Sequence, residues 1–216
     1  MTTAIIVAAG KGERVGLETP KQFIEIDGKQ ILSLSIEAFK KNKEINQIII
    51  VVNEKWHNKI SNLYSDCKVI IGGASRQESV KIGVESCDNH AEIVLIHDAA
   101  RPFISQNIIQ NCIKKIKSAD AVAPILDSTD SLVEINGNKH KLINRRDIKS
   151  VQTPQCFKIN VIKKAMDTKF TSTDEIGLLL KKNPNSNLVF IKGSSKNFKI
   201  TSKYDLLLAK CLMKNK

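Results

Sequence analysis

The cations Lys11, Arg14 and Lys21 follow the first apolar run of the chain, in a segment that contains three glycines. Glycine allows the backbone to approach a ligand closely, and cationic side chains neutralise phosphate oxygens. The segment is not a Walker loop, because no Gly-Lys-Ser/Thr follows, and it is not a dinucleotide fingerprint, because Val15 stands where the last glycine would fall. We therefore predict a phosphate-binding loop of another kind.

A second glycine-containing segment, Gly72-Gly73-Ala74-Ser75, lies between an apolar run and a helical pattern. Its backbone groups and small side chains, together with Ser79, could line a pocket for a nucleotide base. The same residues also fit an ordinary helix start, in which Ser75 is the N-cap and Glu78 completes a capping box. The two interpretations are compatible.

A carboxylate stands at the end of the apolar run 93–96, within the sequence His97-Asp98-Ala99-Ala100-Arg101. At the end of a strand, Asp98 is placed to bind Mg²⁺ or a ribose hydroxyl. The two alanines leave room for a ligand. We interpret His97 as a structural turn residue rather than a general base.

A further polar region contains Ser128, the pair Arg145-Arg146 and Thr153. Hydroxyl groups and an arginine fork suit a second anionic substrate. The same residues also fit a set of turns and surface charges, so both interpretations remain open here. The later segment 171–175 is interpreted first as a helix cap and second as a ligand contact.

The elements that must position these residues alternate along the chain. Strand-like apolar runs fall at 3–9, 47–52, 68–71, 92–97, 120–126 and 187–191, and helical patterns fall near 31–42, 54–65, 76–87 and 105–118. This alternation predicts an α/β fold with a mostly parallel twisted sheet flanked by helices, whose ligands bind beyond the carboxyl ends of the strands. We expect a single domain over residues 1–216.

The region from about 127 to 150 interrupts this alternation with a predicted β-hairpin. Residues 132–135 and 139–143 form its strands, and Asn136-Gly137 forms its turn. A hairpin this polar cannot bury itself well alone. It is either a surface excursion or an arm that packs on a second subunit, and the residues alone do not decide between the two.

The charge and cysteine content limit the class of protein. The net charge of +12 raises nucleic acid as a partner, but the charge comes from scattered lysines, aromatic residues make up only 5%, and no recognition motif is present. The five arginines all lie in segments described above or beside them. No run is long and apolar enough for a membrane span, and the five widely spaced cysteines indicate a reducing cytoplasm.

Together these segments resemble the 2-C-methyl-D-erythritol 4-phosphate cytidylyltransferases of the non-mevalonate isoprenoid pathway. The resemblance covers nearly the whole chain and rests on six motifs in order: AAGKGERVG…PKQF, GGASRQESV, HDAARPF, RDIKSVQTPQCF, TDE and NFKIT. The ribitol 5-phosphate cytidylyltransferases are the alternative, since they share PKQF and QTPQ. They tend toward AGGKG and HDAVRP, so Ala9 and Ala100 favour the isoprenoid family.

The resemblance implies a Rossmann-like nucleotidyltransferase fold, a homodimer locked by the hairpin arm, and transfer of a cytidylyl group from CTP to methylerythritol 4-phosphate with Mg²⁺. The implied catalytic residues, facing the triphosphate, are Arg14, Lys21 and Lys199. The implied CTP-binding residues are Ala8, Ala9, Gly10, Gly73, Ala74, Ser79 and Asp98, of which Asp98 also binds the metal. The implied acceptor-binding residues are Arg101, Ser128, Arg145, Thr153 and Thr173, with Arg145 reaching in from the partner subunit.

The chemistry agrees with this assignment. A phosphate monoester has a second pKa of about 6, so the attacking group is already ionised near neutral pH and needs no general base. The reaction needs cations that relieve the repulsion between two anions and stabilise the charge of the leaving pyrophosphate. Of these cations, we expect Lys21 to contribute most to stabilising the transition state.

Overall fold

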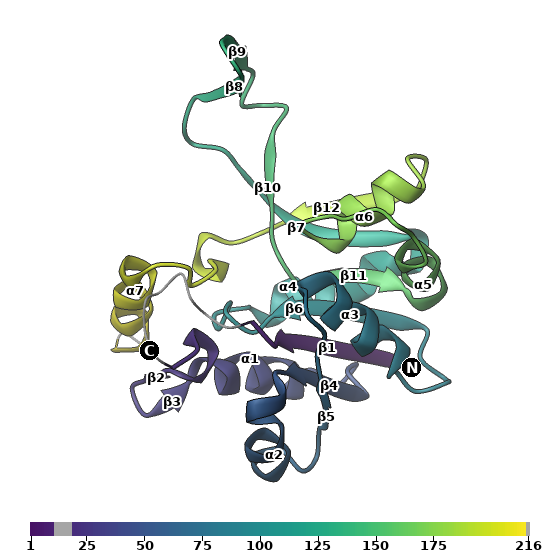
Figure 1. The fold of residues 1–216 in the computed structure, drawn as a ribbon, viewed down its shortest axis with the longest axis vertical. Helices are drawn as coiled ribbons and strands as arrows, with labels where there is room; N and C mark the ends of the chain where they lie inside the picture. Colours follow the sequence, from purple (N-terminus) through teal and green to yellow (C-terminus); the bar gives the residue numbers. More distant parts are fainter. Residues whose placement is uncertain (11–18, 215–216) are drawn as a thin grey trace.

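The computed structural model describes residues 1–10 and 19–214, and its centre is an eight-stranded sheet (Figure 1). The strands of this sheet are β1 (Thr2–Ala8), β4 (Gln47–Val52), β5 (Lys68–Ile71), β6 (Ile93–Asp98), β7 (Ala121–Asp127), β10 (Lys149–Val151), β11 (Gln155–Lys158) and β12 (Leu188–Lys192). Their order is β10-β7-β11-β6-β1-β4-β5, and β12 pairs with β7 off this path.

The sheet is mostly parallel, as the sequence predicts. β1 pairs in parallel with β4 and β6, β4 with β5, and β7 with β12. β11 lies antiparallel between β6 and β7, and β10 is antiparallel to β7. All six predicted strands form. The sequence analysis missed β10 and β11, because runs of three and four residues are too short to show a pattern.

Helices cover both faces of the sheet because alternate side chains of its strands point in opposite directions. Ala4 and Ile6 of β1 lie in one core and Ile5 in the other. The first core is covered by α1 (Ile31–Lys40), α2 (Glu54–Leu63) and α4 (Gln106–Lys115), and the second by α3 (Arg76–Glu85), α5 (Ile159–Met166) and α6 (Glu175–Lys182). The four predicted helices are confirmed, each ending two or three residues earlier than expected.

A smaller hydrophobic cluster joins the C-terminal helix to a short hairpin in the N-terminal part of the chain. The last helix, α7 (Lys203–Lys214), packs near the short hairpin of β2 (Glu25–Ile26) and β3 (Lys29–Gln30). Buried Ile26, Ile200 and Leu206 join these elements. The segment that carries Lys199 is therefore attached both to the sheet and to α7. No helix of the described residues is long and apolar enough to cross a membrane.

The predicted hairpin forms as β8 (Leu132–Asn136) and β9 (Lys139–Ile143), and it projects away from the sheet (Figure 1). Asn136 pairs with Lys139, so the two-residue loop is Gly137-Asn138, one position later than the predicted Asn136-Gly137. Gly137 has a φ of +58°, a conformation that favours glycine at the first loop position.

The arm exposes one apolar face. Val133 and Leu142 are directly paired, and Ile135 lies two residues along from Val133, so the three side chains share a face. Their exposed fractions are 52%, 74% and 69%. This face has no cover within the part of the chain that the structure describes.

Candidate active site

The centre of the site is the carboxylate of Asp98, the last residue of β6, whose exposed fraction is 7%. Among the described residues, three cations form ion pairs with it. Arg76 Nε lies 3.2 Å from Asp98 Oδ1, while Lys199 Nζ lies 2.9 Å and Arg101 Nε 3.5 Å from Asp98 Oδ2. The structure thus brings together three residues that the sequence analysis placed in the site, Asp98, Arg101 and Lys199, and adds Arg76.

These cations keep Asp98 ionised. Burial raises the pKa of its carboxyl, but the charges of Arg76, Lys199 and Arg101 outweigh burial and hold the pKa well below its usual range. Asp98 is therefore a hard anionic oxygen ligand at neutral pH. Among the described residues, no group of three or more His, Cys, Asp or Glu side chains could hold a metal ion. One carboxylate beside phosphate oxygens is a normal Mg²⁺ environment, so the residues present fit the predicted metal.

Arg76 also holds a second buried carboxylate. Its NH1 and NH2 groups donate to Glu175 Oε1 and Oε2 at 2.6 and 3.1 Å, and Glu175 is only 2% exposed. Burial raises the pKa of Glu175, and the Arg76 guanidinium opposes that rise. Sequence reasoning missed this pair. Its one available signal was the use of arginine at position 76 in a chain that has 29 lysines and five arginines.

Lys199 is positioned by the short 3-10 helix η4 (Ser195–Asn197) before it and by the turn after β6, which contacts Ile200. Asn197, fully buried, donates through Nδ2 to the Thr153 carbonyl at 2.8 Å. Its own carbonyl accepts from Arg101 NH1 at 2.8 Å. The Ile200 amide then donates to the Ala100 carbonyl at 2.9 Å. Contacts on both sides of Lys199 thus fix its backbone beside Asp98.

Thr153 is buried against the backbone of Asp98. It is 3% exposed, its Oγ1 accepts from the Asp98 amide at 3.1 Å, and the same hydroxyl lies 3.1 Å from His97 Nδ1. It precedes Pro154 through a cis peptide bond. In this structure the Thr153 hydroxyl therefore orders the end of β6, and its predicted contact with the acceptor remains a prediction.

His97 belongs to β6 itself, so its interpretation as a turn residue is wrong, although it does have a structural position. It is fully buried, and its Nε2 lies 3.1 Å from the Arg101 carbonyl. Burial lowers its pKa to about 4. His97 is neutral at physiological pH and has no access to a substrate.

The opening loop is described on both sides of residues 11–18. Ala8 ends β1, and Gln22 Nε2 donates to the carbonyls of Ala8 and Gly10 at 2.6 and 2.7 Å. Lys21, 8% exposed, lies next to Gln22 in the 3-10 helix η2 (Lys21–Phe23). Gln22 therefore ties the strand end to the PKQF motif, a role that the sequence analysis did not assign. The predicted catalytic residue Arg14 lies outside the described residues.

The predicted base-binding loop follows β5 and lies against the opening loop. A Cβ at Gly72 would come within 2.7 Å of both Ala9 Cβ and Ser79 Oγ, so glycine is needed where the two loops meet. Ser79 Oγ accepts from the Gly73 amide at 3.1 Å and donates to the Ser75 carbonyl at 2.8 Å. Ser79 is thus occupied in ordering this loop.

The start of α3 fixes the same loop from the helix side. Ser75 caps α3 as predicted, because its Oγ accepts from the Glu78 amide at 3.0 Å. Glu78 Oε2 accepts from the Ala74 amide at 2.8 Å instead of completing the box at Ser75. Arg76 is the first residue of α3, directly after the cap residue Ser75, so the cap fixes the backbone from which Arg76 contacts Asp98.

A pocket of about 660 Å³ opens beside the charged cluster. Its lining includes Arg76, Lys199 and Thr173, so it brings the predicted acceptor residue Thr173 next to two cations of the cluster. Asp174, directly after Thr173, caps α6 by accepting from the Gly177 amide at 2.8 Å, which confirms the predicted helix cap. This pocket is a candidate acceptor site.

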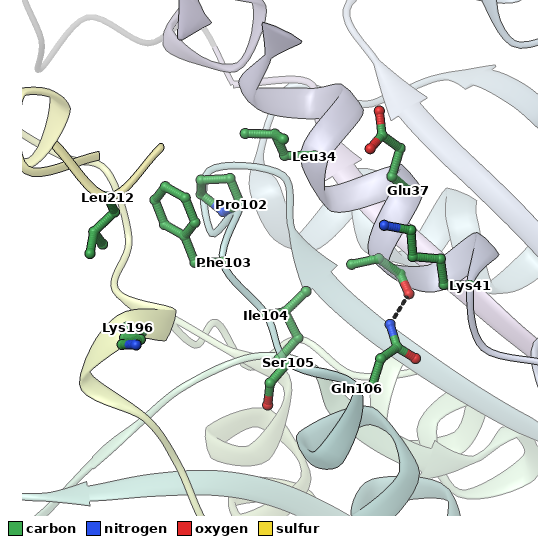
Figure 2. Close-up of a pocket in the computed structure, with 11 residues that line it drawn as sticks. Leu34, Glu37, Lys41, Pro102, Phe103, Ile104, Ser105, Gln106, Lys196 and Leu212 are labelled. Atoms are coloured by element: carbon green, nitrogen blue, oxygen red, sulfur yellow. Dashed lines mark hydrogen bonds between the residues drawn. The ribbon is translucent and has the colours of Figure 1, made fainter. Parts of the chain in front are cut away.

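A second pocket, of about 460 Å³, lies between α1, the start of α4 and α7 (Figure 2). Phe103, Ile104 and Leu212 are among the side chains that surround it, and Gln106 donates across it to the Ala38 carbonyl at 2.6 Å. None of the predicted site residues lines it. We therefore assign the site to the Asp98 side of the molecule.

Two predicted acceptor-binding residues do not join the cluster. Ser128 Oγ donates to the Asp130 carbonyl at 3.2 Å, and Arg145 NH1 donates to the Thr129 carbonyl at 2.8 Å. At the base of the arm, Arg145 is exposed and Ser128 is half-buried. Within the described ranges 1–10 and 19–214, no hydrogen bond or ion pair connects either residue to Asp98 or its cations. If they bind the acceptor, they do so in a second copy or after movement.

An α/β sheet with a buried carboxylate, several cations and a glycine-bordered loop at its carboxyl edge is the arrangement expected of an enzyme that binds phosphorylated ligands. Comparison with known proteins refines the class. Residues 2–215 match the family described as IspD: 2-C-methyl-D-erythritol 4-phosphate cytidylyltransferase. The chain belongs to this family.

Two individual relatives carry the name of this family, and a third is named for CDP-ribitol chemistry. The 2-C-methyl-D-erythritol 4-phosphate cytidylyltransferase of Bacteroides fragilis is 36% identical over 98% of this chain and 99% of its own length. The crystal structure of 4-diphosphocytidyl-2C-methyl-D-erythritol synthase from Anaerococcus prevotii superposes with a TM-score of 0.89 at 26% identity, covering 99% of this chain and 96% of that one. The bifunctional ribulose 5-phosphate reductase/CDP-ribitol pyrophosphorylase of Haemophilus influenzae is 32% identical over 98% of this chain but only 48% of its own length.

The burial of His97 predicts a measurable pH dependence of stability. With a native pKa of about 4 against about 6.5 when unfolded, the unfolded state alone binds this proton between those pH values. His97 therefore costs nothing above pH 6.5 and disfavours the folded state increasingly as the pH falls toward 4, by up to about 3 kcal/mol.

We expect the His97→Gln variant to lose less unfolding free energy than the wild type between pH 6.5 and 4, measured by urea denaturation without added metal. The exposed His90→Gln variant is the control and should follow the wild type. Parallel curves for His97→Gln and the wild type would contradict a neutral, buried His97.

Proposed function

We propose that this protein transfers the cytidylyl group of CTP to 2-C-methyl-D-erythritol 4-phosphate, giving 4-diphosphocytidyl-2-C-methyl-D-erythritol and pyrophosphate. The observation that carries the proposal is the cluster of Arg76, Arg101 and Lys199 around Asp98, beside a glycine-bordered loop, in a chain that matches the family over residues 2–215. The cluster supplies the positive charge that two anionic substrates require.

The reaction needs no proton transfer to begin. An ionised oxygen of the acceptor phosphate attacks the α-phosphorus of CTP, a new P–O bond forms, and the bond to the β-phosphate oxygen breaks with its electron pair on pyrophosphate. Lys21, Arg14 and Lys199 are proposed to neutralise the triphosphate. The absence of an accessible base at His97, which is fully buried, is compatible with this chemistry.

Mg²⁺ is proposed as the metal, bound by Asp98 together with phosphate oxygens, where it would supply charge neutralisation. For Asp98 Oδ2 to serve as a ligand, Lys199 and Arg101 must share or give up their contacts with it. In this proposal Lys199 turns toward the phosphates when the nucleotide binds, and Arg101, which also holds the Asn197 carbonyl, shares its charge with them. Ala8, Ala9, Gly10, Gly73, Ala74 and Ser79 are proposed to border the nucleotide.

The identity of the acceptor is the part most open to test, since one relative is named for CDP-ribitol chemistry. We expect pyrophosphate release from CTP and Mg²⁺ only when methylerythritol 4-phosphate is present, because the acceptor site must match both the phosphate and the branched polyol. A coupled pyrophosphate assay across methylerythritol 4-phosphate, ribitol 5-phosphate and erythritol 4-phosphate measures this directly. Faster turnover with ribitol 5-phosphate would transfer the assignment to the alternative family.

We further propose a homodimer held together by the arm. Support comes from the exposed apolar face of Val133, Ile135 and Leu142, which water disfavours, and from the position of Arg145 and Ser128 away from the cluster of their own chain. A partner's arm would bring these two residues to the acceptor phosphate, beside Thr173 of the pocket. For the buried Thr153 to contact the same phosphate, its hydroxyl must give up its contact with the Asp98 amide. In this proposal the excess of lysine attracts anionic substrates in the cytoplasm and does not bind nucleic acid.

Subunit mixing tests whether the arm completes the partner's site. Lys21→Ala should lower kcat by about a thousandfold, because a cation at the reacting phosphates is lost. Arg145→Ala should be similarly defective. If each site combines Lys21 of one chain with Arg145 of the other, an equimolar mixture should recover about a quarter of wild-type activity, since half the dimers carry one intact site.

The neighbouring exposed Arg146→Ala variant is the matched control and should stay active alone. Subunit exchange is verified with differently tagged chains. An inactive mixture of exchanged dimers would place both residues in the site of one chain.

A further inference from the structure

The two oxygens of Asp98 have different partners. Oδ1 is contacted by Arg76 Nε at 3.2 Å, whereas Oδ2 is contacted by Lys199 at 2.9 Å and by Arg101 at 3.5 Å. Arg76 Nε donates a hydrogen bond to Oδ1, whereas Oδ2 is the nearer carboxylate oxygen for both Lys199 and Arg101. The carboxylate therefore has one side tied to Arg76 and one side shared by cations that the proposed function assigns to the substrates.

Arg76 is itself fixed by contacts that do not involve Asp98. Its NH1 and NH2 groups form a two-bonded fork with Glu175 at 2.6 and 3.1 Å. Glu175 is held in turn, because Gln155 Oε1 accepts from the amides of Glu175 and Ile176 at 3.1 and 3.0 Å. Such a fork leaves the guanidinium little freedom, so Nε points at Oδ1 from a defined direction.

The charges of the cluster explain why such a fixed cation is useful. Arg76, Arg101 and Lys199 face Asp98 and Glu175, so the cluster carries three positive and two negative charges. If Lys199 and Arg101 turn to the phosphates, the remaining group of Arg76, Asp98 and Glu175 has one net negative charge. That residual charge favours a divalent cation at Oδ2, while Arg76 still holds Oδ1.

We propose that Arg76, fixed by Glu175, is a positioning residue that holds Asp98 Oδ1 so that Oδ2 can exchange its cations for the metal-bound nucleotide. This inference rests on the assignment of Asp98 to the nucleotide site made above. Arg76 touches neither substrate nor metal in this proposal, and it acts through Asp98. Its removal should therefore affect the part of CTP affinity that depends on Mg²⁺.

A single substitution at Arg76 has an ambiguous outcome. Arg76→Met leaves the 2% exposed Glu175 buried without its partner, and we expect a fall in Tm of about 10 °C. The double variant Arg76→Met/Glu175→Gln removes both charges together and should recover most of that loss. It separates the pairing of Arg76 with Glu175 from the effect of Arg76 on Asp98.

The measurement is the ratio of the Kd for CTP in EDTA to the Kd for CTP in saturating Mg²⁺, by isothermal titration calorimetry. We expect Mg²⁺ to tighten CTP binding by at least about tenfold in the wild type, and by less than about threefold in the double variant. Arg76→Lys, which keeps the charge but loses the fork, should lie between them. A loss of structure in the pocket would weaken binding in both conditions and leave the ratio unchanged.

Lys81→Met is the matched control, because Lys81 lies on the same helix, lines the same pocket and is exposed. Its ratio should equal that of the wild type. A stable double variant with the wild-type ratio would overturn the proposal, since Arg76 would then serve only to pair with Glu175. A wild type that binds CTP with no effect of Mg²⁺ overturns this inference and the metal role of Asp98 together. A wild type that does not bind CTP overturns the proposed function first.

Discussion

The buried carboxylate of Asp98 is the interaction on which the rest of the site depends. A charge at 7% exposure is costly unless it is paired, and here three cations from separate parts of the chain pair it. Arg76, Arg101 and Lys199 meet at Asp98. In the proposed function Lys199 and Arg101 turn toward the phosphates while Arg76 stays with the carboxylate.

The fold supplies this cluster through the ends of its strands. β6 places Asp98 at the carboxyl edge of the sheet, α3 starts with Arg76, and α6 starts with Glu175. The antiparallel strand β11 begins at Gln155, whose amide oxygen holds the start of α6. Buried Thr153 orders the end of β6 from behind. Short polar contacts at element ends, rather than the apolar core, thus set the direction of each charged side chain.

Sequence reasoning predicted the parallel sheet, its six longer strands and several members of the cluster, because apolar runs and local motifs are visible in one dimension. It missed the pair of Arg76 and Glu175, which are 99 positions apart and meet because α3 and α6 both pack on α5. Nor did it reveal that Thr153 is buried beside the Asp98 amide, because Thr153 comes just before β11, a strand too short to predict. The contact of Thr153 with the acceptor stays a prediction. The ends of distant elements come into contact only when the chain packs. The local pattern of residues therefore does not reveal these contacts.

A crystal structure of the protein with CTP and Mg²⁺ tests the central claim most directly. The quantity to measure is the separation of Lys199 Nζ from Asp98 Oδ2, which is 2.9 Å here. We predict that Lys199 leaves Asp98 for a phosphate oxygen, that the metal contacts Oδ2, and that Arg76 Nε stays at Oδ1. A complex in which Lys199 remains paired with Asp98 and the triphosphate lies elsewhere would contradict it.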